Sequence, residues 1–97
     1  MAKGYWVTAY RSVSDPDKLA AYGALAGPAI TAGGGRFLVR APHATPHDAG
    51  LDQRTVVVEF DSLEAAKATH DSEAYQAALA VLGDAVERDF RIVEGVA

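Results

Sequence analysis

Four β-prone segments and two helical segments follow one another along the chain in an order that few folds can satisfy. Aromatic and β-branched side chains, which favour a pleated and half-buried surface, mark strands at residues 4–11, 36–40, 55–60 and 88–94. Between them, apolar residues recur at spacings of three and four, which is typical of amphipathic helices. The order βαββαβ predicts an α+β, ferredoxin-like fold, with a four-stranded antiparallel sheet and two helices on one face.

The first helix has clear boundary signals. Asp15 can cap its N-terminus and Pro16 suits its first turn, while the glycines at 33–35 end it. Gly27-Pro28 lies inside this pattern. Because proline removes a backbone donor and clashes with the preceding turn, we expect a kink or a restart there.

The second helical segment carries two start signals. Asp61 or Ser62 can cap its first turn, and Asp71-Ser72 supplies a second cap. This pattern predicts a helix that breaks near His70 and begins again. Residues 41–53 have two prolines, one glycine and no periodicity, so we expect a long loop, of the kind that is often functional or mobile.

Three of the strands fail to alternate between apolar and polar residues. Bulky or apolar groups stand at consecutive positions in 5–7, 37–39 and 56–58, whereas a sheet with one wet face should alternate. Both faces therefore need cover, yet the two helices can cover only one. A second copy of the chain can supply the missing layer, so we expect a homodimer joined sheet to sheet, with Leu38 and Val57 on positions that must be buried.

Composition limits the possible functions. The 97 residues fit a single domain, 1–97, and the net charge of −4 gives neither a phosphate-binding surface for nucleic acid nor attraction to an anionic membrane. Cysteine is absent, which excludes disulfides and thiolate chemistry. There is no apolar run of about 20 residues and no signal-peptide pattern, so a cytoplasmic protein is expected. No nucleotide-binding or hydrolase motif occurs, and no cofactor is predicted.

Several sequence blocks, in order, resemble the bacterial family known as domain of unknown function 1330. They are Gly4-Tyr5-Trp6-Val7, Gly34 to Arg40, Arg54 with Val56 to Phe60, Ser72-x-x-Tyr75-Gln76, and Val93-Glu94-Gly95-Val96. The resemblance covers nearly the whole chain. It implies the dimeric α/β-barrel superfamily, in which two ferredoxin-like sheets face one another. That superfamily includes cofactor-free monooxygenases and muconolactone isomerase-like enzymes.

The chain departs from the usual pattern of that family at three places. Thr69 stands where the family usually has an aromatic residue, Leu82 replaces a frequent arginine, and His47-Asp48-Ala49 replaces a Glu-Gly pair. If these positions line a ligand site, the pocket of this chain differs from the typical one.

Arginines form the first set of candidate binding residues. Arg36 and Arg40, four residues apart on one strand, are expected on the same face, and Arg54 can neighbour them if the second and third strands form a hairpin. Guanidinium groups bind carboxylates in a bidentate manner. The alternative is that these arginines form salt bridges with Glu59, with Glu94 or with a partner subunit.

A second set combines histidine and aromatic residues. His70 and Tyr75 are candidate catalytic residues. The ordinary pKa of a histidine side chain lies close to neutral pH, which suits proton transfer, and Tyr75 is expected near His70. Trp6, Tyr22 and Arg40 are candidate substrate-binding residues, with Arg40 as the anion anchor. The alternative is a structural role, in which the tyrosines are core residues and His70 caps the broken helix.

A third cluster, His43, His47 and Asp48, carries metal-ligand side chains. Pro46 prevents the helical spacing that would bring the two histidines together, so a solvated loop is expected and no metal site is predicted.

Two functions remain open at this point. The first is a small-molecule-binding protein or cofactor-independent enzyme, monooxygenase-like or isomerase-like by superfamily analogy, that takes an apolar or carboxylated metabolite between helices and sheet. The second is a non-catalytic dimer with a binding or accessory role. The sequence does not decide whether the chain is an enzyme.

Overall fold

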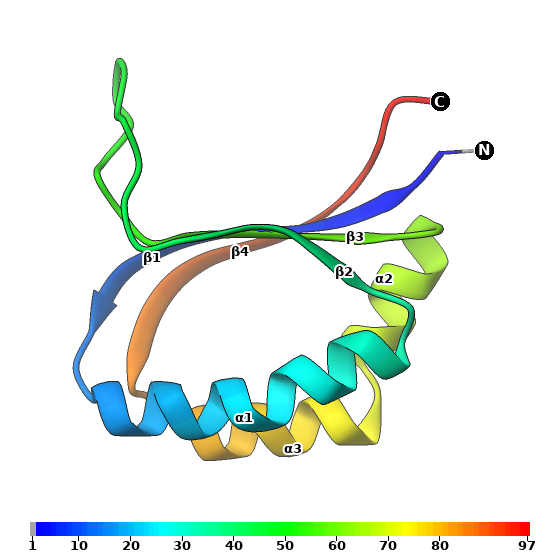
Figure 1. Ribbon diagram of the computed structural model, residues 1–97, viewed down its shortest axis with the longest axis horizontal. Coiled ribbons are helices and arrows are strands. Elements are labelled where there is room, and N and C mark those ends of the chain that lie inside the picture. The colour runs from blue at the N-terminus through cyan, green and yellow to red at the C-terminus, as the bar shows by residue number, and fades with distance from the viewer. Residues whose placement is uncertain (1) are drawn as a thin grey trace.

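The computed structural model describes residues 2–97 (Figure 1). The strands are β1 (Gly4–Val13), β2 (Arg36–Ala41), β3 (Thr55–Phe60) and β4 (Val86–Glu94). The helices are α1 (Pro16–Ala32), α2 (Leu63–His70) and α3 (Glu73–Leu82). The strands form one antiparallel sheet in the order β2-β3-β1-β4, and all three helices lie on one side of it. The predicted ferredoxin-like fold is confirmed.

Helix α1 runs without interruption through Pro28, so the expected restart is wrong. A proline inside a helix removes one N–H donor, but Ala26, Ala29 and Ile30 on either side of it are buried against the rest of the core. Tertiary packing therefore holds the helix together where the local signal favours a break. The N-terminal prediction is confirmed, since the Asp15 side chain accepts hydrogen bonds from two backbone amides of the first turn.

The second helical segment divides as predicted. Ser62 caps α2 by accepting a hydrogen bond from the amide of Ala65, and Ser72 caps α3 by accepting one from the amide of Tyr75. The Ser72 hydroxyl also donates to the carbonyl of Thr69, 2.7 Å away, at the end of α2. This break turns α3 so that it can pack along α1.

Strand β2 contains a bulge at Leu38, which has no partner residue in β3. An extra residue in a strand moves every later side chain to the opposite face. Arg36 therefore lies opposite Glu59 and points away from the helices, whereas Arg40 lies opposite Val56 and points toward them. The prediction that both arginines share one face is wrong for this reason.

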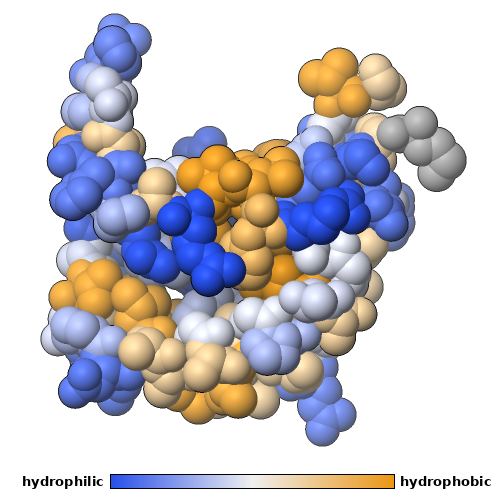
Figure 2. Space-filling model, viewed as in Figure 1, coloured by the Kyte–Doolittle hydropathy of each residue, from blue (hydrophilic) through white to orange (hydrophobic). Residues whose placement is uncertain are grey.

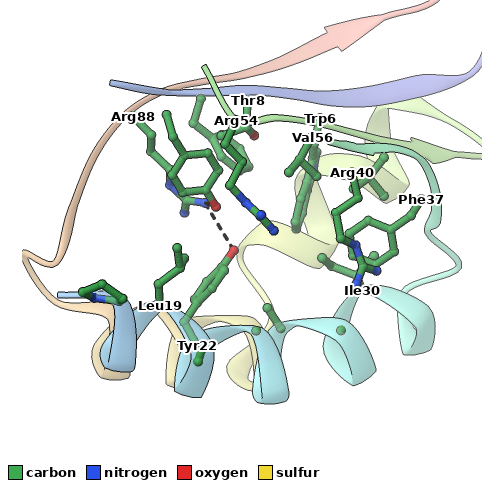
Figure 3. Close-up of a pocket in the computed structure, with 18 residues that line it drawn as sticks. Trp6, Thr8, Leu19, Tyr22, Ile30, Phe37, Arg40, Arg54, Val56 and Arg88 are labelled. Carbon is green, nitrogen blue, oxygen red and sulfur yellow. Dashed lines mark hydrogen bonds between the residues drawn. The ribbon is translucent and has the colours of Figure 1, made fainter. Parts of the chain in front are cut away.

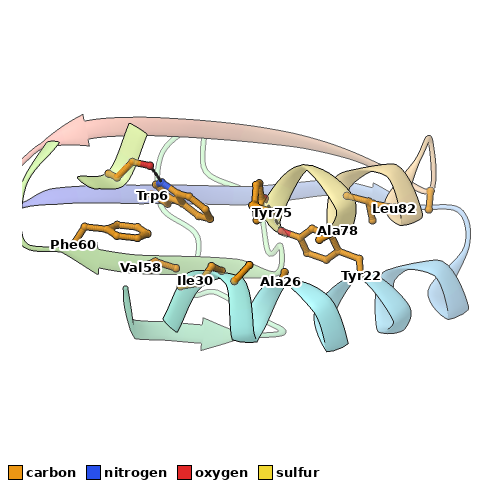
Figure 4. Packing of buried hydrophobic residues seen from close by; sticks show 12 residues of the cluster. Trp6, Tyr22, Ala26, Ile30, Val58, Phe60, Tyr75, Ala78 and Leu82 are labelled. Carbon is orange, nitrogen blue, oxygen red and sulfur yellow. Dashed lines mark hydrogen bonds between the residues drawn. The ribbon is translucent and has the colours of Figure 1, made fainter. Parts of the chain in front are cut away.

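The buried core lies between the helices and the inner face of the sheet, which is the face that the helices cover (Figure 4). Its largest members are the aromatic residues Trp6, Tyr22, Phe60 and Tyr75. The indole N–H of Trp6 donates to the carbonyl of Ala66 at 2.9 Å, so its polar atom is satisfied within the core. The remaining members are mostly alanines on the helices, together with Ile30, Val58 and Leu82.

The opposite, outer face of the sheet is apolar and open. Val7, Val39 and Val93 are each at least 36% exposed, Leu38 is 54% exposed, and Val57 lies between Val7 and Val39 in the register. The sheet therefore carries apolar side chains on both faces. This agrees with the consecutive apolar residues of the strand segments in the sequence.

Two projections border the outer face. In Figure 1 the loop between β2 and β3 rises from one end of the sheet, on the side opposite the helices, and the C-terminal segment rises near the other end. In Figure 2 apolar atoms (orange) lie between these projections. The outer face is therefore the floor of a broad trough.

Candidate ligand-binding site

A cavity of about 320 Å³ lies between α1 and the inner face of the sheet (Figure 3). Its volume is in the range of small-molecule sites. Apolar and aromatic side chains form most of the wall, namely Trp6, Phe37, Val56, Val58 and Phe90 from the sheet and Leu19, Tyr22 and Ile30 from α1. Arg40, Arg54 and Arg88 add three positive charges.

Small residues on α1 leave room for this cavity. Ala20, Gly23, Ala26 and Gly27 line it from the helix side. The sheet side contributes large rings, so α1 is held away from the strands while it remains packed against α3. In Figure 2 hydrophilic side chains (blue) reach across the opening between the sheet and the lower helix layer.

Arg88, on β4, is surrounded by three phenols. Its Nη1 donates to the hydroxyl of Tyr10 at 3.2 Å and of Tyr22 at 3.3 Å, and its Nη2 donates to the hydroxyl of Tyr75 at 3.1 Å. The hydroxyls of Tyr22 and Tyr75 are themselves 2.7 Å apart. The three hydroxyls thus converge on one guanidinium group.

Burial and charge act on these groups in different directions. Burial raises the pKa of Tyr22 well above its usual value, and Arg88 only partly offsets this effect, so the phenol is neutral. Burial disfavours the charge of Arg88, but the phenol oxygens of Tyr22 and Tyr75 outweigh it, and the pKa of Arg88 stays above its usual value. The site is therefore a permanent cation surrounded by neutral hydroxyls.

Arg54 and Arg40 stand on the same wall of the cavity. The Nε of Arg54 is buried and has no hydrogen-bond partner among residues 2–97, and its guanidinium carbon lies 5.8 Å from the centre of the Tyr10 ring. Arg40 stacks on Phe37 at 3.9 Å and is exposed, which places it at the rim. Among residues 2–97, no carboxylate forms a salt bridge with Arg40, Arg54 or Arg88.

The structure brings together some of the predicted site residues and not others. Trp6, Tyr22 and Arg40 all line the cavity. Tyr75 is completely buried behind Tyr22 and reaches the site only through its hydroxyl. His70 does not line the cavity; its ring packs against the rings of Tyr75 and Phe90, with centroids 5.4 and 5.5 Å away.

Sequence reasoning missed Tyr10 and Arg88. The signal that could have found them is strand phase, because side chains two residues apart share a face. Arg88 is in phase with the inward-facing Phe90 and Ile92, and Tyr10 is in phase with Trp6. An arginine in phase with core residues is unusual, since charged groups are seldom buried without a partner.

The loop cluster of the sequence does not assemble into a site. His43 Nδ1 lies 3.3 Å from a carboxylate oxygen of Asp52, and both side chains are mostly exposed. Within residues 2–97, no three histidine, aspartate or glutamate side chains are close enough together to hold a metal ion. None of the helices in this part of the chain is long and apolar enough to cross a bilayer.

Comparison with protein families agrees with this architecture and with the sequence blocks described above. The model of DUF1330, a domain of unknown function, matches residues 3–96. The chain belongs to the DUF1330 family. No curated protein matches it.

Solved structures similar to this DUF1330 domain share its fold at low sequence identity. A protein of unknown function from Rhodopseudomonas palustris matches with a TM-score of 0.71 and 19% identity, over 99% of this chain and 84% of the other. A candidate antibiotic biosynthesis monooxygenase from Caulobacter crescentus matches with a TM-score of 0.60 and 19% identity, over 99% and 91% of the two chains.

A third similar structure is described as dimeric. This ferredoxin-like protein of unknown function from Thermobifida fusca matches with a TM-score of 0.54 and 16% identity, over 95% of this chain and 90% of the other. At such identities these likenesses establish the fold and leave activity open.

Proposed function

We propose that this DUF1330 protein is a homodimer, joined through the outer faces of its sheets, in which each copy binds a small carboxylated and otherwise apolar molecule in the cavity beside α1. The observation that carries the proposal is the set of three cavity arginines, none of which has a carboxylate partner among residues 2–97.

The charge of these arginines supports an anionic ligand. Removing a cation from water is costly unless a counter-charge or hydrogen bonds compensate it. Arg54 has neither at its buried Nε. A carboxylate accepts two parallel N–H bonds from one guanidinium group, so a bound acid would satisfy Arg54 directly and could also reach Arg40 at the rim.

The rest of the wall supports an apolar ligand body. Trp6, Phe37 and Phe90 present rings to the cavity, and Leu19 and Ile30 close it from α1. An aromatic or branched aliphatic acid would bury its carbon skeleton against these side chains.

The outer face supports the homodimer. Val7, Leu38, Val39 and Val93 form an exposed apolar surface across the strands, and contiguous apolar surfaces of this kind mark sites of association. A second copy offers the same surface in a two-fold arrangement. The dimeric description of the Thermobifida fusca protein agrees with this assembly.

Binding is tested with benzoate, cinnamate and hexanoate by thermal shift and isothermal titration calorimetry. A ligand at ten times its Kd stabilises the folded state by about 1.4 kcal/mol, which corresponds to several degrees of Tm in a domain of this size. Arg54→Gln should weaken acid binding and reduce the shift strongly. Arg91→Gln, which removes an outer-face arginine paired with Asp89, is the matched control and should leave it unchanged. No stabilisation of the wild type by any acid in such a panel would refute the proposed ligand class.

Catalysis is the further part of this proposal, in the monooxygenase-like or isomerase-like form that the superfamily resemblance implies. A cofactor-free oxygenation would convert a substrate methylene and O₂ into a carbonyl and water, whereas an isomerisation would leave the mass unchanged. Incubation of bound acids with and without O₂, followed by mass spectrometry, separates the two. Tight binding without any product would instead favour the non-catalytic alternative.

A further inference from the structure

The hydroxyl hydrogens of Tyr10 and Tyr22 are directed by the hydrogen-bond network around Arg88. A guanidinium group only donates hydrogen bonds, so the oxygens of Tyr10, Tyr22 and Tyr75 all accept from it. The O–H group of each phenol can therefore still donate one hydrogen bond.

The hydroxyl of Tyr75 has a single possible hydrogen-bond acceptor among residues 2–97. The residue is fully buried, and the Tyr22 oxygen, 2.7 Å away, is the only acceptor within reach of its hydroxyl among residues 2–97. An unsatisfied buried donor costs free energy, so Tyr75 donates to Tyr22. The Tyr22 oxygen then accepts from both Tyr75 and Arg88.

Tyr22 and Tyr10 are left with hydrogens that no residue in 2–97 accepts. Both tyrosines line the cavity, and both oxygens lie within 3.3 Å of the same nitrogen of Arg88, so the two hydroxyls are neighbours. One ligand oxygen with two lone pairs could accept from both. Figure 3 shows Tyr22 and Arg88 meeting across the cavity, with Arg54 beside them.

Resting on the proposed carboxylate-binding function, we infer that the ligand is an oxo-acid, whose carboxylate binds Arg54 and whose carbonyl oxygen lies between the hydroxyls of Tyr10 and Tyr22. Three N–H groups of Arg88 are used by the phenols, while the buried Nε of Arg54 has no hydrogen-bond partner among residues 2–97. The carboxylate therefore goes to Arg54, and the phenols receive an uncharged acceptor. The neighbouring charge of Arg88 strengthens their donation.

The burial of Tyr22 agrees with this role. A phenol whose pKa is raised by burial keeps its proton throughout the neutral range, so it remains a donor. Arg88 and Tyr75 are positioning residues in this arrangement, because they orient the two donor hydroxyls and need not touch the ligand.

The test compares matched acids that differ by one carbonyl: 4-oxopentanoate with pentanoate, 5-oxohexanoate with hexanoate, and 4-acetylbenzoate with 4-ethylbenzoate. Calorimetry should show the oxo member of at least one pair binding about tenfold more tightly to the wild type, which equals about 1.4 kcal/mol. Tyr22→Phe and Tyr10→Phe should each reduce this ratio, and the double variant should bring it to about one.

Three further variants separate the contributions. Arg54→Gln should weaken both members of a pair equally and keep their ratio. Tyr75→Phe should lower the ratio without changing the affinity for the simple acid, which a purely structural role would not do. Tyr5→Phe removes an outer-face hydroxyl bonded to Glu59 and should change neither affinity.

The outcomes distinguish the two proposals. If the acids bind in an Arg54-dependent manner but the carbonyl brings no advantage, or if the advantage survives in the Tyr10 and Tyr22 variants, the oxo-acid inference is wrong and carboxylate binding stands. If neither member of any pair binds, both proposals are overturned.

Discussion

The two faces of the sheet differ in whether their arginines have carboxylate partners. On the outer face, Arg36 contacts Glu59 at 2.8 Å and Arg91 contacts Asp89 at 3.0 Å. On the inner face, Arg54 and Arg88 have no carboxylate partner among residues 2–97, although the inner face is the less exposed of the two. Paired charges are typical of a stable surface, whereas unpaired charges within a concave apolar wall are the observation on which the proposed anionic ligand rests.

The faces also differ in what covers them. Three helices and a core rich in aromatic residues and alanine cover the inner face, yet a cavity remains. On the outer face, residues 2–97 leave several valines exposed. The contrast is the basis for proposing ligand binding on one face and association with a second copy on the other.

The largest expected effect concerns the outer face. Val57→Asp places a carboxylate at its centre, and we expect the dimer to dissociate completely, because an unpaired charge in an apolar interface is costly. Multi-angle light scattering at micromolar concentration measures the mass. Leu38→Asp should act in the same way.

The matched control for the outer-face variants is Val81→Asp on α3, at a valine that is 38% exposed. It should remain dimeric. A wild-type protein that is monomeric at micromolar concentration would show that the outer face does not pair copies of the chain.

A smaller effect is expected on the helix side of the inner face. His70→Ala removes ring contacts with Tyr75 and Phe90, and we expect the free energy of unfolding to fall by about 1–2 kcal/mol. Because His70 does not line the cavity, acid affinity should change by less than about twofold, which is below 0.5 kcal/mol. A large loss of affinity, or of turnover if the protein proves catalytic, would instead support the role for His70 that the sequence predicts.

The contrast between paired and unpaired arginines predicts effects of opposite sign. Arg54→Met removes a buried N–H without a partner, so the free energy of unfolding in the absence of ligand should rise by about 1 kcal/mol. Arg36→Met removes a partner of Glu59 and Asp61, so the Tm should fall slightly. Denaturant unfolding of both variants gives the sign of the change in the free energy of unfolding. A decrease in stability for Arg54→Met would mean that its guanidinium group is already satisfied.

The smallest expected effect is on the pH dependence of stability. Hydrogen bonds from Arg36 and Tyr5 hold the pKa of Glu59 below its usual 4.5, so the stability from this group is lost as pH falls through and below that value. Burial raises the pKa of Tyr22 above its usual 10.0, so the folded state keeps a proton that the unfolded state releases, and stability is lost as pH rises above 10.

Unfolding curves across pH can separate these two contributions. Glu59→Gln should flatten the decrease on the acid side, and Tyr22→Phe should flatten the decrease on the basic side. If Tyr22→Phe leaves the basic limb as steep as in the wild type, burial of the phenol does not control its titration.

Much of the architecture was accessible from the sequence because it depends on local patterns. The strand segments, the Asp15 cap and the break after His70 each follow from side-chain type and spacing, and the structure has all of them. Consecutive apolar residues in the strands also predicted that both faces of the sheet would carry apolar groups, which Val7, Val39 and Val93 do. For the site, Trp6, Tyr22 and Arg40 were predicted and line the cavity.

Other features depend on contacts that no local pattern contains. Pro28 stays within α1 because residues beside it pack on distant elements. The bulge at Leu38 interrupts the alternation of side chains along β2. Arg36, before the bulge, therefore lies on the outer face, and Arg40, after it, lies on the inner face. The meeting of Tyr10, Tyr22 and Tyr75 on Arg88 joins residues up to 78 positions apart, from β1, α1, α3 and β4.

The sequence by itself therefore determined the order of elements and the need to cover two sheet faces, since these follow from the period of apolar residues along each segment. Only the tertiary structure decided which arginines are paired and which surround the cavity. Charge pairing depends on strand register and on the distance between α1 and the sheet, and both are set by long-range packing.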